Sequence, residues 1–333
     1  MKLQEIGEFG LIARIRKWMA ASNPSLIQGI GDDAAVIDIG ERGGKVVLVT
    51  TDILIEGIHF DRAWIDPYRL GKKSLFVNLS DIAAMGGTPK YFLISFGIPK
   101  NLPFSFASLL YRGLKDGAKK FQVDLIGGDT SLSKKVVINI CLLGEGKRQN
   151  LLFRKGAKVG DDLYVSGTLG DAALGLKILR KKGLKKGRKG LVEKHLSPSP
   201  RIQLGKAIGK HHWATAMIDV SDGLLIDAKH LLEESKVGAR IWEDRIPLSR
   251  IYQKWIHFYS KDHYQLALSG GEDYELLFTA PTQRRGKISA FARSSKILIT
   301  RIGEILPERE GFYIIKKDGK EYSPLRLGFE HFR

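Results

Sequence analysis

Residues 66–87 read DPYRLGKKSLFVNLSDIAAMGG, and both ends of this stretch carry the signals of a helix. Asp66 is a residue type that caps helix N-termini, and Pro67 suits the first helical position. Gly86 and Gly87 are expected to end the helix, because glycine readily adopts the backbone conformation that follows one. The stretch therefore predicts a single helix between the strand-like segments on either side of it.

Asp81 falls in the last turns of this predicted helix, which is an unfavourable place for a carboxylate. The C-terminal end of a helix carries partial negative charge, so an acidic side chain there costs about 0.3–1 kcal/mol. The neighbours of Asp81 are apolar: Leu79, Ile82, Ala83 and Ala84. A cation close to Asp81 would explain its placement.

Strand-like apolar runs alternate with helical segments on both sides of residues 66–87, which is the order of an α/β (α+β) protein. The polar stretch GEGKRQN, residues 144–150, is predicted to be a turn between two such series. At 333 residues the chain is long enough for two domains. We therefore expect two domains, one over residues 1–146 and one over residues 147–333.

The net charge of +18 raises the possibility of nucleic-acid binding. The basic residues crowd into 177–194, where the interspersed glycines indicate the end of a helix and a solvated loop. The sequence has no zinc-finger spacing, no aromatic-studded basic strand and no helix-turn-helix signature. We therefore expect no specific nucleic-acid partner, and a polyanion-binding protein stays as an alternative function of a different class.

No segment approaches the roughly 18 uninterrupted apolar residues that a membrane span needs, so no membrane partner is expected. The single cysteine, Cys141, lies in a strand-like run and is expected to be a small buried core residue. One cysteine cannot form an internal disulfide, which favours a cytoplasmic location.

Acidic residues gather in segments that contain no Lys or Arg, although the chain as a whole is basic. If these acids converge, carboxylates about 4 Å apart repel by roughly 4 kcal/mol per pair at an effective dielectric constant of 20. Either their pKa values rise or cations neutralise them, and carboxylate and Thr oxygens are the hard ligands that Mg²⁺ prefers. The segments are 29–36 (GIGDDAAV), 46–60, 74–89, 123–133, 214–228 and 264–280.

Glycine accompanies nearly every one of these acids. Glycine lets backbone N–H groups approach an anion closely, as the N-termini of helices do. Acids that hold Mg²⁺ beside glycines that hold phosphate are typical of a nucleotide-dependent phosphoryl-transfer site. Examples are Gly31, Gly128, Gly167, Gly223 and Gly271.

Each segment taken alone also has a plain structural interpretation. The SDG of residues 221–223 precedes a helical pattern, so Ser221 is expected to cap that helix. Asp124, Asp227 and Glu275 are expected to be solvated or structural.

Taken in chain order, the motifs resemble those of the thiamine-monophosphate kinase family. They are EIGEFGLIARI, GIGDDAAV, TTDILIEGIHF, NLSDIAAMGGTP, GGDTS, VSGTLGDAALGL, IDVSDGLLIDAKHL and SGGEDYELLFT. The resemblance runs from about Glu5 to the C-terminal GFEHF, and the set is far more specific than any one motif. The basic residues 181–189 match no motif of the family.

The resemblance implies ATP-dependent phosphorylation of thiamine monophosphate to thiamine diphosphate, by direct in-line transfer with several Mg²⁺ ions. It also implies an aminoimidazole ribonucleotide synthetase-like fold, in which two subunits pair through their N-terminal sheets and each C-terminal domain is an α/β layer. Residues 1–146 would then be an N-terminal metal- and nucleotide-binding and dimerisation domain, and residues 147–333 a C-terminal α/β domain. The acceptor is itself a phosphate, whose oxygen is already deprotonated, so positioning and charge neutralisation suffice without a strong general base.

The resemblance also implies roles for individual residues. Its catalytic residues would be Asp52, Asp81 and Asp129. Its metal ligands would be Asp33, Thr50, Thr51, Asp52, Asp81, Asp129, Asp219 and Asp222. Asp32, beside Asp33, would then support the site or shape the turn. ATP would contact Tyr111, Gly128, Asp129, Arg154 and Ser221. Thiamine phosphate would contact His59, Glu272 and Phe329, the last at a position where many relatives carry Trp.

Other ATP-dependent enzymes of the same superfamily are the nearest alternatives. A purine-synthesis ligase shares the acidic motifs, and a selenophosphate synthetase would in addition be expected to use a reactive cysteine or selenocysteine near its N-terminus. Cys141 lies far from the N-terminus, which disfavours the second of these enzymes.

Overall fold

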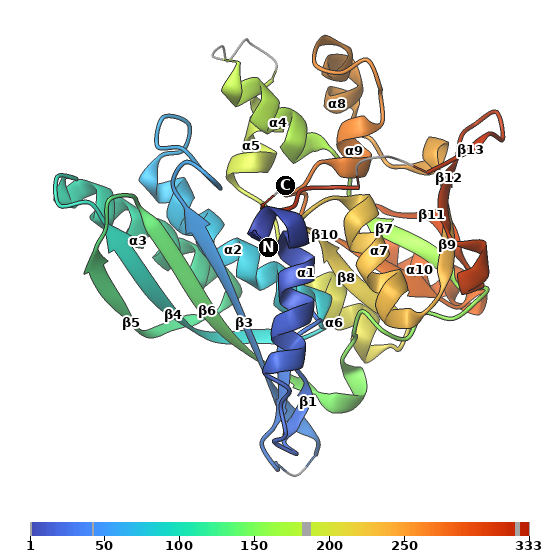
Figure 1. Ribbon diagram of the computed structural model, residues 1–333, viewed down its shortest axis with the longest axis horizontal. Coiled ribbons are helices and arrows are strands. Elements are labelled where there is room, and N and C mark those ends of the chain that lie inside the picture. Colours follow the sequence, from blue (N-terminus) through green and yellow to red (C-terminus); the bar gives the residue numbers. More distant parts are fainter. Residues whose placement is uncertain (1, 42, 182–187, 324–326, 333) are drawn as a thin grey trace.

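The computed structural model describes residues 2–41, 43–181, 188–323 and 327–332 (Figure 1). Its strands form two sheets, one from each half of the chain, with helices packed against both. The helices are α1 (Leu3–Trp18), α2 (Pro67–Ala84), α3 (Phe104–Phe121), α4 (Asp171–Arg180), α5 (Lys189–Leu196), α6 (Ile202–Lys210), α7 (Leu224–Ser235), α8 (Arg250–Trp255), α9 (Gln265–Ser269) and α10 (Arg285–Ser295).

The N-terminal sheet has six strands in the order β1-β2-β3-β6-β4-β5. Neighbouring strands are antiparallel except for the parallel pair β4 and β5. Edge strand β5 is exposed along its whole length. The bounds are β1 Leu26–Gln28, β2 Ala35–Asp38, β3 Lys45–Ile55, β4 Thr88–Ile98, β5 Asp124–Leu132 and β6 Val137–Lys147.

The C-terminal sheet has seven strands in the order β13-β12-β9-β11-β7-β10-β8. Strands β7 and β10 and the edge strand β8 are buried at every residue, which is typical of a sheet covered on both faces. The bounds are β7 Asp162–Ser166, β8 Ala216–Val220, β9 Gly238–Trp242, β10 Glu275–Ala280, β11 Ile299–Leu306, β12 Phe312–Ile315 and β13 Glu321–Tyr322. The mixed α/β class with two sheets confirms the predicted fold class.

Helix α2 lies between the two halves (Figure 1) and contacts the N-terminal sheet as well as β8 and α6 of the C-terminal half. The close approach of α3 depends on glycine, because a Cβ atom at Gly71 would lie 2.1 Å from the carbonyl oxygen of Leu110. As predicted, Asp66 caps α2 by accepting a hydrogen bond from the backbone N–H of Arg69 (2.9 Å). Asp81 is thereby placed one turn from the helix end, at the junction of the halves.

One face of the N-terminal sheet packs on α2 and α3, and the opposite, outer face is exposed. Side chains alternate along β4, so that Phe92 and Ile94 are buried while Tyr91 and Leu93 are exposed. Cys141 points to the outer face of β6 and is only half-buried, so the prediction of a buried core cysteine was wrong. The outer face therefore presents apolar side chains to solvent.

The connection between the halves differs from the predicted turn. β6 continues through Lys147 because residues 144–147 pair with β3, so the first part of GEGKRQN is strand. A single short 3₁₀ helix over Arg148–Asn150 follows it. The boundary between residues 146 and 147 stays a prediction.

Two further sequence expectations concern chain segments outside the sheets. Part of the predicted solvated loop within residues 177–194 lies outside the described residues, namely 182–187. Among the helices that the structure describes, none is both long and apolar enough to cross a membrane.

Candidate active site

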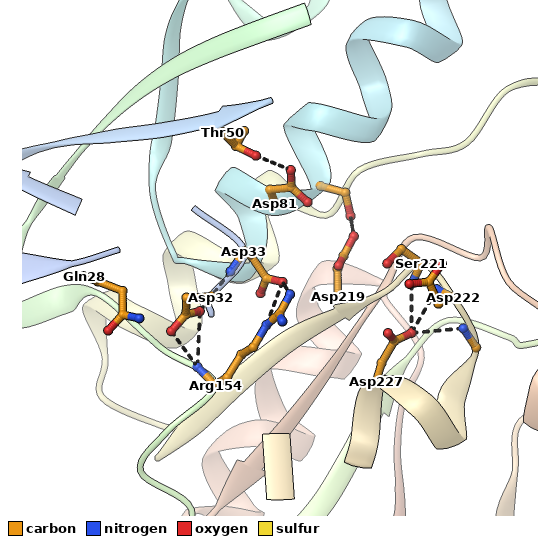
Figure 2. Close-up of polar contacts among 12 residues, drawn as sticks. Gln28, Asp32, Asp33, Thr50, Asp81, Arg154, Asp219, Ser221, Asp222 and Asp227 are labelled. Atoms are coloured by element: carbon orange, nitrogen blue, oxygen red, sulfur yellow. Dashed lines mark hydrogen bonds and ion pairs between the residues drawn. The ribbon is translucent and has the colours of Figure 1, made fainter. Parts of the chain in front are cut away.

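Carboxylates from four chain segments lie beside the C-terminal end of α2, and Figure 2 shows those of Asp33, Asp81, Asp219 and Asp222 among them. Asp33 lies in the loop between β1 and β2, and Asp52 on β3. Asp81 lies on α2, while Asp219 and Asp222 come from the end of β8 and the loop that follows it. These five side chains, here called the acidic cluster, were all predicted as metal ligands. The structure brings them together from segments up to 189 residues apart in the chain, Asp33 and Asp222.

Two short hydrogen bonds fix the cluster on α2. The Thr50 hydroxyl donates to Asp81 Oδ2 at 2.6 Å, so this predicted ligand lies on the inner face of β3. The Ser80 hydroxyl donates to Asp219 Oδ2, also at 2.6 Å, and ties α2 to β8. The cluster is therefore oriented by groups of both halves of the molecule.

Arg154 is the base that enters this cluster within the described part of the chain. Its guanidinium donates to Asp33 Oδ1 through Nη2 at 2.5 Å and through Nε at 3.2 Å. Asp33 Oδ2 remains buried without a hydrogen-bond partner among the described residues. A predicted ATP contact and a predicted metal ligand thus form an ion pair that leaves one coordinating oxygen free.

Burial and mutual repulsion raise the pKa values throughout the cluster. Burial, followed by the charge of Asp33, raises the pKa of Asp52 to about 6. Burial, followed by the charges of Glu8 and Asp52, raises the pKa of Asp222 to about 7. For Asp81 and Asp219, burial and neighbouring carboxylates raise the pKa well above its usual value. One arginine faces five carboxylates, so the cluster is short of positive charge.

The donor set of the cluster fits Mg²⁺. Carboxylate and hydroxyl oxygens are its preferred ligands, and added positive charge would relieve the repulsion that raises these pKa values. Among the described residues, no three acidic, histidine or cysteine side chains already converge as a closed metal cage would require. Mg²⁺ usually keeps several waters and takes one or two carboxylates plus substrate phosphates, so a closed cage is not expected.

Two further aspartates beside the cluster, Asp32 and Asp227, accept hydrogen bonds from backbone N–H groups. Asp32 accepts hydrogen bonds from the backbone N–H groups of Asp33 (3.0 Å) and Arg154 (3.2 Å), as expected for a supporting turn residue. Asp227 accepts the N–H groups of residues 221–223 at 3.0–3.1 Å. Helix α7 begins after Gly223 without a side-chain cap, so the prediction that Ser221 caps it was wrong.

The remaining predicted ligands lie elsewhere in the protomer. Thr51 alternates to the outer face of β3, where its hydroxyl accepts a hydrogen bond from Asn139 Nδ2 at 3.0 Å. Asp129 on β5 is three strands from Asp52, roughly 14 Å at the usual strand spacing. Tyr111 packs its ring on Phe96 of β4, with centroids 6.1 Å apart. Gly128 and Asp129 lie on the exposed edge strand, so the predicted ATP contacts form two separate groups.

The three predicted thiamine contacts lie together near the first half of α2, where Lys73 contacts Glu272. His59 and Phe329 both lie against His331, with ring centroids 5.2 and 4.9 Å apart. Burial, followed by the charge of His331, lowers the pKa of His59, and Glu272 is close enough to act in the opposite direction. Phe329 is exposed on one side. Aromatic rings and one carboxylate therefore surround the place where the substrate is expected.

Two residues that the sequence did not single out hold Glu272. Lys73 Nζ lies 2.8 Å from Glu272 Oε1, and His195 Nδ1 lies 2.6 Å from Oε2. Burial alone would raise the pKa of Glu272, but the Lys73 ammonium and the His195 imidazole outweigh it and hold the pKa well below its usual value. Lys73 precedes Ser80 by seven residues, so the two side chains lie on the same face of α2. This spacing is the feature of the sequence from which Lys73 could have been identified.

Comparison with known proteins agrees with this geometry. Residues 31–145 match the family model of the AIR synthase related protein, N-terminal domain, and residues 158–316 match that of its C-terminal domain. The thiamine-monophosphate kinase of Aquifex aeolicus (strain VF5) is 39% identical over 334 residues, covering 100% of both chains. That of Escherichia coli (strain K12) is 36% identical over 329 residues, covering 98% of both chains.

A solved structure is similar over the same length. It is described as AaThiL complexed with AMPPCP and TMP, and it superposes with a TM-score of 0.86 at 38% sequence identity. The match covers 99% of each chain, so both halves and the junction between them are shared.

Proposed function

The chain belongs to the thiamine-monophosphate kinase family, and we propose that its acidic cluster holds the Mg²⁺ ions used in phosphoryl transfer. The reaction is the ATP-dependent phosphorylation of thiamine monophosphate to thiamine diphosphate. The observation that carries the magnesium proposal is the convergence of five buried carboxylates with raised pKa values, of which Asp33 is the one that pairs with Arg154.

The proposed ligands are the side chains of Asp33, Thr50, Asp52, Asp81, Asp219 and Asp222. Bound Mg²⁺ would neutralise the negative charge that two phosphate groups bring together. Asp81 and Asp219 are already oriented by Thr50 and Ser80, so little reorganisation of these side chains is required.

Arg154 and Ser221 are the proposed ATP contacts beside the cluster. The guanidinium of Arg154 is the donor with the geometry to bind phosphate oxygens, and its present partner, Asp33, is a proposed metal ligand. Arg154 also donates its backbone N–H to Asp32, which holds the segment in place while the side chain changes partner. No residue has to remove a proton, because the attacking oxygen belongs to a phosphate that is already ionised.

The acceptor is proposed to lie with its phosphate toward the acidic cluster and its rings toward His59, Glu272 and Phe329. His59 Nδ1 accepts a hydrogen bond from the backbone N–H of Ile55 at 3.0 Å, which fixes the ring at the end of β3. Phe329 offers an exposed ring for stacking. The backbone N–H of Phe329 donates to the carbonyl of Asp222 at 3.0 Å, which ties the two parts of the site together.

We also propose a homodimer that forms through the outer faces of two N-terminal sheets. Exposed apolar side chains on β3 and β4, including Ile53, Tyr91 and Leu93, support this interface, as does the uncovered edge strand β5. Asp129 of the partner subunit would then join Thr51, and the two groups of ATP contacts would form one composite site.

Mixing two inactive variants tests the composite site. Asp52→Asn and Asp129→Asn each lack one predicted ligand, so each homodimer should be inactive. After subunit exchange, heterodimers would contain one complete site, and activity should return. If the mixture stays inactive although exchange is demonstrated by mass spectrometry, the partner does not supply Asp129.

A cytoplasmic location is proposed from the requirement for ATP and from the single cysteine.

The deciding experiment for the function uses the purified chain with ATP, Mg²⁺ and thiamine monophosphate, followed by chromatography of the thiamine products. Thiamine diphosphate should form with wild-type protein, and EDTA or the substitution Asp52→Asn should abolish it. Absence of thiamine diphosphate with correctly folded wild-type protein would refute the proposal.

A further inference from the structure

A buried lysine is costly unless its charge is matched, and Lys73 on α2 is 1% exposed. Its partner Glu272 lies in the loop between α9 and β10, and the second partner of that carboxylate, His195, lies on α5 and is 3% exposed. Three elements thus meet at one carboxylate. We call Lys73, His195 and Glu272 the Glu272 triad.

Within the triad, the lysine and the histidine are shielded from solvent, whereas the carboxylate is partly exposed. The side chain of Glu272 is 23% exposed, whereas its two partners are almost completely buried. His59 is near enough for Glu272 and Lys73 to affect its pKa, and the ring of His59 leads through His331 to Phe329. The exposed part of the carboxylate therefore lies near the other residues that are proposed to contact thiamine.

The backbone of Glu272 is fixed as firmly as its side chain. Its φ angle is +69°, a left-handed conformation that is uncommon for residues other than glycine and that costs about 1–3 kcal/mol. The backbone N–H donates to the carbonyl of Ser221 at 2.7 Å, directly beside the acidic cluster. Strain of this kind persists where the surroundings impose it, and here both ends of the residue are held.

The hydrogen-bonding capacity of the carboxylate defines what it can recognise. An ionised carboxylate offers about four acceptor positions and no donor. Lys73 Nζ and His195 Nδ1 each lie against one oxygen, which leaves acceptor positions for a ligand. A ligand on the open side must therefore offer N–H donors or positive charge, as the amino group and the cationic ring of thiamine do.

The spacing along α2 suits one extended substrate. Lys73 precedes Ser80 by seven residues, which corresponds to roughly 10 Å along the helix axis at 1.5 Å per residue. Ser80 and Asp81 lie at the acidic cluster, where the phosphate of the substrate is proposed to bind. The triad is thus placed at the ring end of the same molecule.

We propose that Lys73 and His195 are positioning residues, which hold the carboxylate of Glu272 so that it accepts hydrogen bonds from the amino-substituted, cationic ring portion of thiamine monophosphate. This inference rests on the proposed function. It assigns recognition of the ring end to a buried lysine and histidine that touch no substrate themselves.

A double-mutant cycle of Lys73→Met and Glu272→Gln tests the proposal. Each single variant should raise KM for thiamine monophosphate by about ten- to a hundredfold, with a smaller change in kcat and no change in KM for ATP. Because Lys73 acts through Glu272, the double variant should be no worse than Glu272→Gln alone. Independent, additive effects of the two substitutions on KM would overturn the proposal.

A matched control separates recognition from stability. Arg201 forms a similar buried ion pair with Glu275, in which Nε lies 2.5 Å from Oε2, away from the thiamine contacts. Arg201→Met should lower the melting temperature as Lys73→Met does, but leave KM for thiamine monophosphate unchanged. If both substitutions raise KM equally, the effect of Lys73→Met is one of stability alone.

Variants of His195 keep the test decisive if Lys73→Met fails to fold. The side-chain amide in His195→Asn can offer an N–H to Glu272 near the position of Nδ1 and should preserve KM, whereas His195→Leu should raise it. Equal KM values for the two variants would contradict a positioning role. In each of these experiments, wild-type protein that forms no thiamine diphosphate would refute the proposed function. An active wild-type protein together with variants whose KM for thiamine monophosphate is unaltered would refute only this inference.

Discussion

Helix α2 carries an acid near its C-terminal end and a base in its first half, and the two surroundings are opposites. Asp81 lies among other buried carboxylates, and repulsion and burial raise its pKa. Lys73 lies against Glu272, whose second oxygen is matched by His195, so every charge there has a partner. One helix thus supports a region that lacks positive charge and a region that is balanced.

The difference indicates which region needs a ligand to become complete. The acidic cluster is destabilising by itself, because the ionised forms of buried carboxylates are unfavourable without a cation. The Glu272 triad is complete within the protein and presents a fixed acceptor. We therefore expect substitutions to affect rate and metal binding at the cluster, and substrate affinity at the triad.

The largest effect is expected for Asp81→Asn. This substitution removes a proposed metal ligand where charge builds up in the reaction, so kcat/KM should fall by roughly 10²–10³-fold or more. Because it also removes a repelling charge, the melting temperature measured in EDTA should rise. Differential scanning calorimetry with steady-state kinetics checks both results. An active variant, or one that melts lower in EDTA, would show that Asp81 is structural.

The adjacent pair Asp32 and Asp33 provides the next test. Asp33→Asn removes a proposed ligand with a free oxygen, so turnover should fall by about a hundredfold. Asp32→Asn removes only hydrogen bonds to two backbone N–H groups and should cost less than about tenfold. Equal losses of kcat in the two variants would show that the division of roles is incorrect.

A smaller effect is expected where the two chain termini meet above the site. Glu8 accepts a hydrogen bond from the backbone N–H of His331 at 2.9 Å, and His331 contacts the rings of His59 and Phe329. Glu8→Gln keeps an acceptor, whereas Glu8→Ala removes it. KM for thiamine monophosphate should rise several-fold in Glu8→Ala and change little in Glu8→Gln. A change of KM for ATP instead would place Glu8 at the other substrate.

The smallest effect is a dependence of stability on pH in the absence of metal. Unfolded aspartates ionise near pH 3.8, whereas the pKa of Asp52 is raised to about 6 and that of Asp222 to about 7. Between these values the unfolded chain loses protons that the folded chain keeps, so stability should fall as pH rises from about 4 to about 7. The melting temperature in EDTA should follow this trend, and Asp81→Asn should weaken it. A melting temperature that rises across this interval would contradict the cluster's electrostatics.

Local signals in the sequence predicted local structure well. Asp66, Pro67 and the glycines after residue 85 defined α2 correctly, because capping depends on residues three or four positions apart. The same reasoning failed at Ser221, since Asp227 takes the backbone N–H groups that a cap would satisfy. The Asp227 carboxylate, six residues further along the chain, thus replaces Ser221 as the acceptor at the start of α7.

Long-range pairing could not be predicted from segments that lack Lys and Arg. Those segments are free of bases in the sequence but not in space, because Arg154 reaches Asp33 and Lys73 reaches Glu272 across the fold. The strand alternation that separates Thr50 from Thr51 is visible in the sequence, but which face is covered is decided by α2 and α3. Resemblance to a family supplied the site residues, and the structure supplied their partners.

The central claim is that the acidic cluster binds Mg²⁺ because its carboxylates lack positive charge. Isothermal titration calorimetry of Mg²⁺ at pH 7, repeated in two buffers with different ionisation enthalpies, measures affinity and proton release together. Wild-type protein should bind Mg²⁺ and release protons, and Asp81→Asn should bind more weakly and release fewer. Binding without proton release, or equal binding by the two proteins, would contradict the account.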